Sequence, residues 1–190
     1  QTGHEVFMRQ DNPWDVMGLR EVRNLVRSFN AGQFASALEA AKELAANATT
    51  TKKFYSSISE LMYAYCLWDG FDHKAALAML RQAISRLEPF AVNNPRWHEQ
   101  LCLFKRSEAA LADVQQDAQE LRAFKGKLSP TCGTAYLRDL LANALRRMQA
   151  GRYDDAVARL YSAIEKSAKI ALARHGIDNS KVDLAQVPEE

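Results

Sequence analysis

The sequence predicts an all-α protein built from antiparallel helical hairpins, and two observations carry this prediction. Apolar residues recur at intervals of three and four along most of the 190-residue chain, as on the buried face of amphipathic helices. The pattern A-G-x-[FY]-x-x-A-[LV] occurs at 31–38 and at 150–157, and a looser copy begins at Asp69. The glycine is expected to end one helix in the left-handed conformation. The aromatic residue then fills the gap between two antiparallel helices, and the small alanine lets them approach closely.

Two helices are expected at the start of the chain. Asn12 followed by Pro13 is typical of an N-cap with proline at the first helical position, where its missing N–H costs nothing. This helix should end near Gly32. The second helix should end in the polar, β-branched run at 47–51.

Further helices are expected up to residue 125. One apolar helix should run from Lys52 to Asp69, and the next should end at Pro89. The segment 94–125 opens with a second Asn-Pro pair and contains no later Gly or Pro, so one long helix or two in register are both allowed. Residues 1–125 are therefore predicted to form a subdomain of helical hairpins that resembles tetratricopeptide repeats.

A second helical part is expected at the end of the chain. Glycine, proline and small polar residues are concentrated at 126–134, which predicts a linker. A helix should then run to the turn at Ala150-Gly151, and a long helix should follow. Its expected i,i+4 ion pairs are Asp155 with Arg159 and Glu165 with Lys169.

Composition limits the possible partners. The chain carries 25 basic and 23 acidic residues, so any nucleic-acid contact must be local rather than the effect of a global basic field. The three cysteines lack CxxC spacing, which argues against a disulfide framework or a zinc site and favours a reducing cytoplasm. No stretch approaches the roughly 18 uninterrupted apolar residues of a membrane span. We expect no metal, no cofactor and no membrane partner.

The C-terminal stretch from Leu137 to Glu190 resembles the helical region of the CRISPR-associated Cas02710 family, whose members are similar in plan to the Csm6 and Csx1 effectors. The best match lies at 151–164, where G-x-Y-x-x-A-V leads into A-R-L-Y-x-A-I-E, and the tail HGI-x-x-S-x-V-D follows. Upstream, N-P-W-D at 12–15 and the alanine-rich hairpin behind it also fit the family. The resemblance therefore covers nearly the whole chain.

The resemblance implies a defence protein of a type III CRISPR system. In such proteins a CARF domain senses a cyclic oligoadenylate, and a helical, HEPN-like region responds as a metal-independent ribonuclease. The implied partners are a second copy of the chain and single-stranded RNA. The sequence lacks the alternating strands and helices of a CARF domain. We therefore expect residues 135–190 to be a HEPN-like segment, truncated at its C-terminal end, in a chain that cyclic oligoadenylate reaches only through an absent CARF domain.

HEPN ribonucleases typically carry an arginine, a polar residue and a histidine spaced by four to six residues on one helix. No histidine of this chain has an arginine five to seven positions before it: His4, His73, His98 and His175. Arg174 and His175 come nearest and are the candidate catalytic pair. Adjacent helical residues point about 100° apart, so this pair shares one phosphate only across a dimer or at a frayed terminus. The alternative is that both cations complement the helix dipole before a Gly176 C-cap.

Arg146, Arg147 and Arg152 form the densest basic cluster and are the candidate RNA-binding residues, with Tyr153 and Tyr161 available to stack bases. In the alternative interpretation the tyrosines pack between helices and the arginines form a solvated face. Two functions follow. The chain is either the effector region of a ribonuclease or a non-catalytic helical scaffold for protein interaction or dimerisation.

Overall fold

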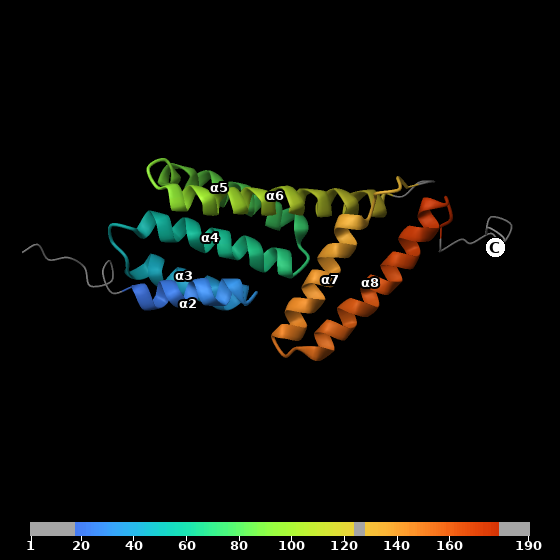
Figure 1. Cartoon of the computed structure of the whole chain (residues 1–190), viewed down its shortest axis with the longest axis horizontal. Helices are drawn as coiled ribbons and strands as arrows, with labels where there is room; N and C mark the ends of the chain where they lie inside the picture. The colour runs from blue at the N-terminus through green and yellow to red at the C-terminus, as the bar shows by residue number, and fades with distance from the viewer. Residues whose placement is uncertain (1–17, 124–127, 179–190) are drawn as a thin grey trace, which may run out of the picture.

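The computed structural model describes residues 18–123 and 128–178 of the chain (Figure 1). These two ranges contain seven α-helices and no strand, so the all-α prediction is confirmed. The helices are α2 (Leu19–Asn30), α3 (Phe34–Asn47), α4 (Lys52–Asp69), α5 (His73–Ala91), α6 (Pro95–Arg122), α7 (Thr134–Gln149) and α8 (Tyr153–Arg174).

Each helix packs against the next one in the chain, and the succession forms antiparallel hairpins (Figure 1). The helices α2 to α6 lie together in one block. The α7–α8 hairpin leaves the end of α6, and its turn lies near the ends of α2 and α4 (Figure 1). None of the described helices is long and apolar enough to cross a membrane.

The core of the block lies between α3, α4, α5 and α6. Leu61, Leu80 and Leu87 are fully buried there. Phe29 closes one end of this core: its ring meets that of Tyr65 edge-on, with 4.9 Å between the ring centroids. The periodic apolar residues of the sequence therefore form one continuous core across the hairpins.

The repeated pattern marks turns of the same backbone geometry. Gly32 and Gly151 have φ angles of 69° and 72°, as the sequence predicted. The looser copy differs, because Gly70 has an ordinary φ and Phe71 takes the left-handed conformation with φ 65°. In each of the three turns, three successive N–H groups donate to carbonyls at equivalent positions of the preceding helix. At the looser copy this complete set of hydrogen bonds holds Phe71, a non-glycine residue, in the strained region.

Several helix boundaries decide questions that the sequence left open or answered wrongly. The segment after Asn94 is one helix, and the Asn94 side chain caps it by accepting from Trp97 N at 3.1 Å. The helix expected to end at Pro89 runs on to Ala91, which is buried and so stabilises the last turn beyond the proline. The helix start at Pro13 and residues 124–127 of the expected linker lie outside the described residues.

Of the two ion pairs expected on α8, one is confirmed and one is wrong. Lys169 donates to the Glu165 carboxylate. Arg159 instead lies over the ring of Phe71, with 4.4 Å from its guanidinium carbon to the ring centroid. Asp155 pairs with Arg152 at 2.8 Å, because both side chains extend from the first turn of the helix. The division into subdomains at 126–134 stays a prediction.

Candidate functional site

Two of the predicted RNA-binding arginines converge on the carboxylate of Asp69, which the sequence marked only as the start of the looser turn pattern. Arg146 Nε lies 3.0 Å from Asp69 Oδ1, and Arg147 Nη2 lies 2.5 Å from Asp69 Oδ2. Asn143 Nδ2 donates to the same carboxylate at 2.8 Å and to the Asp69 carbonyl at 3.0 Å. Because Asp69 is the last residue of α4, these bonds fix α7 to the end of that helix.

A second carboxylate, that of Asp139, lies on α7 one turn before Asn143 and also contacts residues near the end of α4. Asp139 accepts a hydrogen bond from Trp68 Nε1 at 2.9 Å through Oδ1, and its Oδ2 lies 3.0 Å from His73 Nε2. Asp139 and His73 are both buried, so their polar atoms are satisfied by each other and not by solvent. His73 is therefore a structural histidine that joins α5 to α7.

These contacts together form one interface, which we call the polar joint. It consists of Trp68, Asp69 and His73 around the α4–α5 turn and of Asp139, Asn143, Arg146 and Arg147 on α7. The α7 members are spaced by four, three and one residues and so occupy one face of the helix. This spacing of polar residues in an otherwise apolar helix was the signal in the sequence for a buried polar contact.

The interpretation of the arginines as a solvated face is wrong for Arg146 and Arg147 and right for Arg152, and that of the tyrosines as packing residues is wrong. The side chains of Arg146 and Arg147 are only 24% and 17% exposed, whereas Tyr153 and Tyr161 are 66% and 70% exposed. The physical reason is Asp69, because a carboxylate taken from water needs charged donors around it. Arg152 stays on the surface, where it pairs with Asp155 at 2.8 Å.

The candidate catalytic pair lies at the other end of the α7–α8 hairpin. Arg174 Nη2 donates to the Cys132 carbonyl at 2.9 Å and lies 3.3 Å from Thr134 Oγ1. Arg174 thus fastens the end of α8 to the start of α7. His175 is exposed beside it, and Gly176 follows with φ 82°, so the predicted glycine at the C-terminus of the helix is confirmed.

The two candidate clusters do not converge within one chain. Thr134 and Arg146 are twelve residues apart on α7, which places their ends of the helix about 18 Å apart at about 1.5 Å per residue. Arg174 contacts the first end and Asp69 contacts the second. Of the other histidines, His98 is exposed on α6 with its Nε2 3.8 Å from Cys102 Sγ, and His4 lies outside the described residues.

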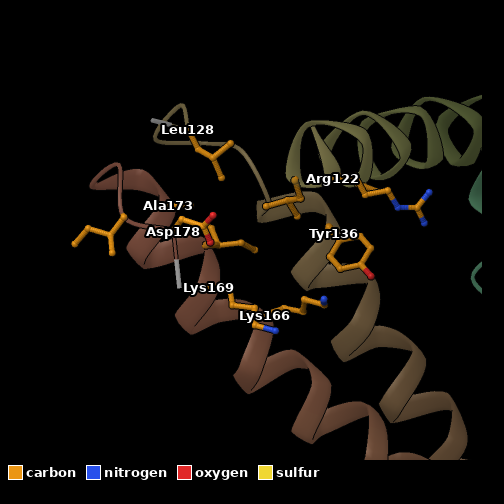
Figure 2. Close-up of a pocket in the computed structure, with 11 residues that line it drawn as sticks. Arg122, Leu128, Tyr136, Lys166, Lys169, Ala173 and Asp178 are labelled. Carbon is orange, nitrogen blue, oxygen red and sulfur yellow. The ribbon is translucent and has the colours of Figure 1, made fainter. Parts of the chain in front are cut away.

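A pocket of about 340 Å³ adjoins the candidate catalytic end of the hairpin (Figure 2). It lies between the last turn of α6, the first turn of α7 and the last turns of α8. Its lining residues are Ala118, Leu121, Arg122, Leu128, Tyr136, Lys166, Lys169, Ile170, Ala173, Ile177 and Asp178. Apolar side chains and cationic side chains therefore meet in one concave site.

Cys132 does not supply a reactive thiol to this end of the hairpin, and the described ranges hold no metal cluster. Burial, followed by a hydrogen bond and the negative charge of Glu120, raises the pKa of the Cys132 thiol to about 11. A thiol with such a pKa stays protonated near neutral pH and is a poor nucleophile. Among residues 18–123 and 128–178, no three His, Cys, Asp or Glu side chains are grouped to hold a metal ion.

The fold and the polar joint define a class: an all-α protein in which a block of helical hairpins is fastened through buried ion pairs to a further hairpin. Comparison with protein families places it more closely. Residues 17–111, half of the chain, match the model of the Csm6 6H domain, and residues 126–190 match that of the Csm6 HEPN domain. The chain therefore belongs to the Csm6-like family of type III CRISPR-associated effectors, and the predicted resemblance is confirmed. No curated protein and no solved structure matches the chain.

Proposed function

We propose that this chain is the helical part of an effector that cleaves single-stranded RNA without a metal ion in response to a cyclic oligoadenylate. The observation that carries the proposal is the match of residues 126–190 to the Csm6 HEPN domain. Attack of a ribose 2′-hydroxyl on the adjacent phosphate needs cationic stabilisation and a proton shuttle. The effector acts in the cytoplasm, a location supported by the three cysteines, all of which are free.

Within the described residues, His175 is our candidate for the proton shuttle and Arg174 for the group that positions it. His175 is exposed at the end of α8 and accessible to an RNA strand. Arg174 is fixed by its bonds to Cys132 and Thr134, so the backbone that carries His175 is held in place. An imidazole in such an exposed position is the usual side chain for proton transfer to and from a hydroxyl.

We further propose that the effector is a homodimer formed through one apolar face of the α7–α8 hairpin. This α7–α8 apolar face consists of Leu141, Leu145, Met148, Tyr153, Val157, Leu160, Tyr161 and Ile164, all exposed. Its α7 members are spaced by four and three residues, and its α8 members continue the same spacing, so each set forms a single stripe.

Both stripes lie on the same side of the hairpin. On α7, Asp139 and Asn143 face the block of α2 to α6. Leu141 stands two residues, or about 200°, from each of them, and Leu145 stands two residues from Asn143. On α8, Val157 stands two residues from Arg159, which lies over Phe71 of the block. The exposed stripes therefore form one continuous face that points away from the block.

The size and the chemistry of this face favour a second copy of the same hairpin as the partner. The exposed side chains amount to roughly 600 Å² of apolar surface, at the upper end of the patches found on monomers and close to one side of a standard interface. The stripes contain no charged residue, which disfavours RNA as the occupant. Two hairpins that pack face to face about a two-fold axis form a four-helix bundle, which buries both faces at once.

The direct test is cleavage of labelled single-stranded RNA by the full-length protein in EDTA, with and without cyclic tetra- or hexa-adenylate. We expect cleavage that depends on the cyclic oligoadenylate and falls about 100-fold or more in His175→Ala, the loss typical of a missing general acid or base. His98→Ala is the matched control, since His98 is also exposed on a helix but lies on α6. Activity that survives His175→Ala would remove this residue from the mechanism and leave the ribonuclease.

A non-catalytic scaffold is the second candidate function, and the polar joint favours it. The ion pairs of Arg146 and Arg147 with Asp69 connect the block to the hairpin, which supports a structural role for these two residues. A scaffold of this kind links the state of a sensor domain to the α7–α8 hairpin without chemistry of its own. Absence of RNA cleavage under every condition of the same assay, together with dimer formation, would favour this function.

A further inference from the structure

We propose that the pocket between α6, α7 and α8 binds one nucleotide, with the base on its apolar floor and the phosphate at its cationic rim. This inference rests on the proposed RNA substrate, and it assigns that substrate a docking site outside the candidate catalytic pair. The volume of about 340 Å³ is at the lower end of small-molecule sites and suits a single nucleotide rather than a longer ligand.

The floor of the pocket is apolar and rigid. Ile170 and Ile177 are each 2% exposed, so their buried bodies are fixed in the packing between α7 and α8. Leu128 closes the site from the segment before α7, where its N–H bonds the Ala173 carbonyl at 3.1 Å. Leu121 and Leu128, which are partly exposed, are the apolar side chains that a planar base would contact.

Tyr136 gives the pocket an aromatic wall. It extends from the first turn of α7, and its backbone N–H donates to Asp117 Oδ2 at 3.1 Å. Its ring also meets the His73 imidazole edge-on, with 5.9 Å between the centroids. The ring is therefore held by two neighbouring elements and is available for stacking with a base, a contact that tolerates every base type.

Cations line the α8 side of the pocket. Figure 2 shows the side chains of Lys166 and Lys169 between α8 and Tyr136. Lys169 is paired with Glu165, whereas Lys166 makes no ion pair within the described part of the chain. Arg122 from the last turn of α6 also lines the pocket, but its guanidinium group points away from Lys166 and Lys169 (Figure 2). Lys166 is therefore the group available to bind a phosphate.

The one acidic residue of the lining does not oppose this arrangement. Asp178 lies beside Ala173, away from Lys166, so a phosphate at the lysine is not placed against its carboxylate (Figure 2). The pocket thus offers an aromatic wall for the base and a cation for the phosphate, the two main contacts of a nucleotide.

The position of the pocket connects it to the candidate catalytic residue. Ala173 and Ile177 line the pocket, and His175 is exposed on the turn between them. A nucleotide held on this floor therefore places its neighbouring phosphate along the turn that carries His175. The pocket would act as a positioning site for RNA, while the chemistry takes place at the turn.

The test is calorimetric titration of the full chain with adenosine monophosphate, adenosine and a tetra-adenylate RNA. We expect adenosine monophosphate to bind and adenosine to bind more weakly. Lys166→Gln should lower the affinity for adenosine monophosphate about tenfold, as expected for the loss of one hydrogen bond to a charged group. Lys74→Gln is the matched control, since Lys74 is exposed on α5 and does not line the pocket, and it should leave the affinity unchanged. Tighter binding of the RNA identifies the strand as the natural ligand, and tighter binding of the monophosphate identifies a free nucleotide.

A second variant, Ala118→Phe, fills the pocket without removing a charge and should abolish binding while thermal unfolding remains cooperative. If Lys166→Gln, Ala118→Phe and the unmodified chain bind adenosine monophosphate with equal affinity, the pocket is not the nucleotide-binding site. Failure of the pocket proposal can be distinguished from failure of the proposed ribonuclease function. RNA cleavage without nucleotide binding overturns the pocket and leaves the proposed function, and nucleotide binding without cleavage supports the pocket and removes the ribonuclease.

Discussion

Asp69 at the end of α4 binds Arg147 of α7 at 2.5 Å across 78 residues of sequence. Arg146 and Asn143 donate to the same carboxylate, so one acidic side chain carries much of the contact between the block and the α7–α8 hairpin. The contact is partly buried, and each member depends on the others for its hydrogen bonds.

Replacement of Asp69 should therefore destabilise the chain strongly. Asp69→Ala leaves two partly buried guanidinium groups without a counter-charge, and we expect a loss of about 2–3 kcal/mol, reduced from the value for a fully buried pair because both arginines retain some exposure. The free energy of unfolding from urea titration measures this loss. Glu165→Ala removes the exposed pair with Lys169 and is the control, with an expected loss below about 1 kcal/mol. Equal losses in the two variants would contradict the structural role of the polar joint.

The pH dependence of stability should carry a contribution from Cys132. Its pKa is raised to about 11 in the folded state by burial and then by Glu120, so the folded chain holds the proton more tightly than the unfolded chain. The stabilisation is complete below the ordinary thiol pKa and is lost as the pH rises through the folded value. Between about pH 9 and pH 11, the unmodified chain should therefore lose more stability than Cys132→Ala. Parallel pH profiles of the two proteins would exclude this linkage.

Most of the fold was predictable because its signals are local. Gly32 and Gly151 mark helix ends by a conformation that other residues avoid, and the buried Ala37 and Ala156 mark the close approach that follows. The turn at Phe71 was less predictable. There the left-handed residue is not a glycine, and the hydrogen bonds that hold it are visible only in the structure.

The candidate site was less predictable, because its partners are distant in sequence. Arg146 and Arg147 form a basic cluster in one dimension, and nothing near them in the chain indicates that Asp69 neutralises them. Conversely, Tyr161 is typical of a packing residue by its spacing, yet no described element covers it. Which face of a two-helix hairpin is covered depends on elements that local periodicity does not identify.

The dimer proposal predicts a change in mass on adding charge to the α7–α8 apolar face. Val157→Lys with Ile164→Lys should convert a dimer to a monomer, because four buried cations would face one another across the two-fold axis. Val92→Lys is the control: Val92 is 78% exposed but lies alone at the end of α5, so its replacement should leave the mass unchanged. Sedimentation equilibrium measures the result. A double variant that remains dimeric, or an unmodified chain that is monomeric at every concentration, would refute this interface.

Two glycines with the same backbone conformation should respond differently to alanine, because their surroundings differ. Gly151 has φ 72°, and no atom lies within 4 Å of the position that a Cβ would take, so Gly151→Ala should lose only the backbone strain of about 1–2 kcal/mol. Gly133 has φ 86°, and a Cβ there would stand 2.6 Å from Ile170 Cδ1. Gly133→Ala therefore adds the displacement of a fully buried side chain, at about 1–3 kcal/mol more. Urea titration of both variants measures the difference. Because Ile170 also forms the pocket floor, the affinity for adenosine monophosphate should fall in Gly133→Ala and not in Gly151→Ala, and equal behaviour of the two variants in both measurements would contradict the packing described for this end of the hairpin.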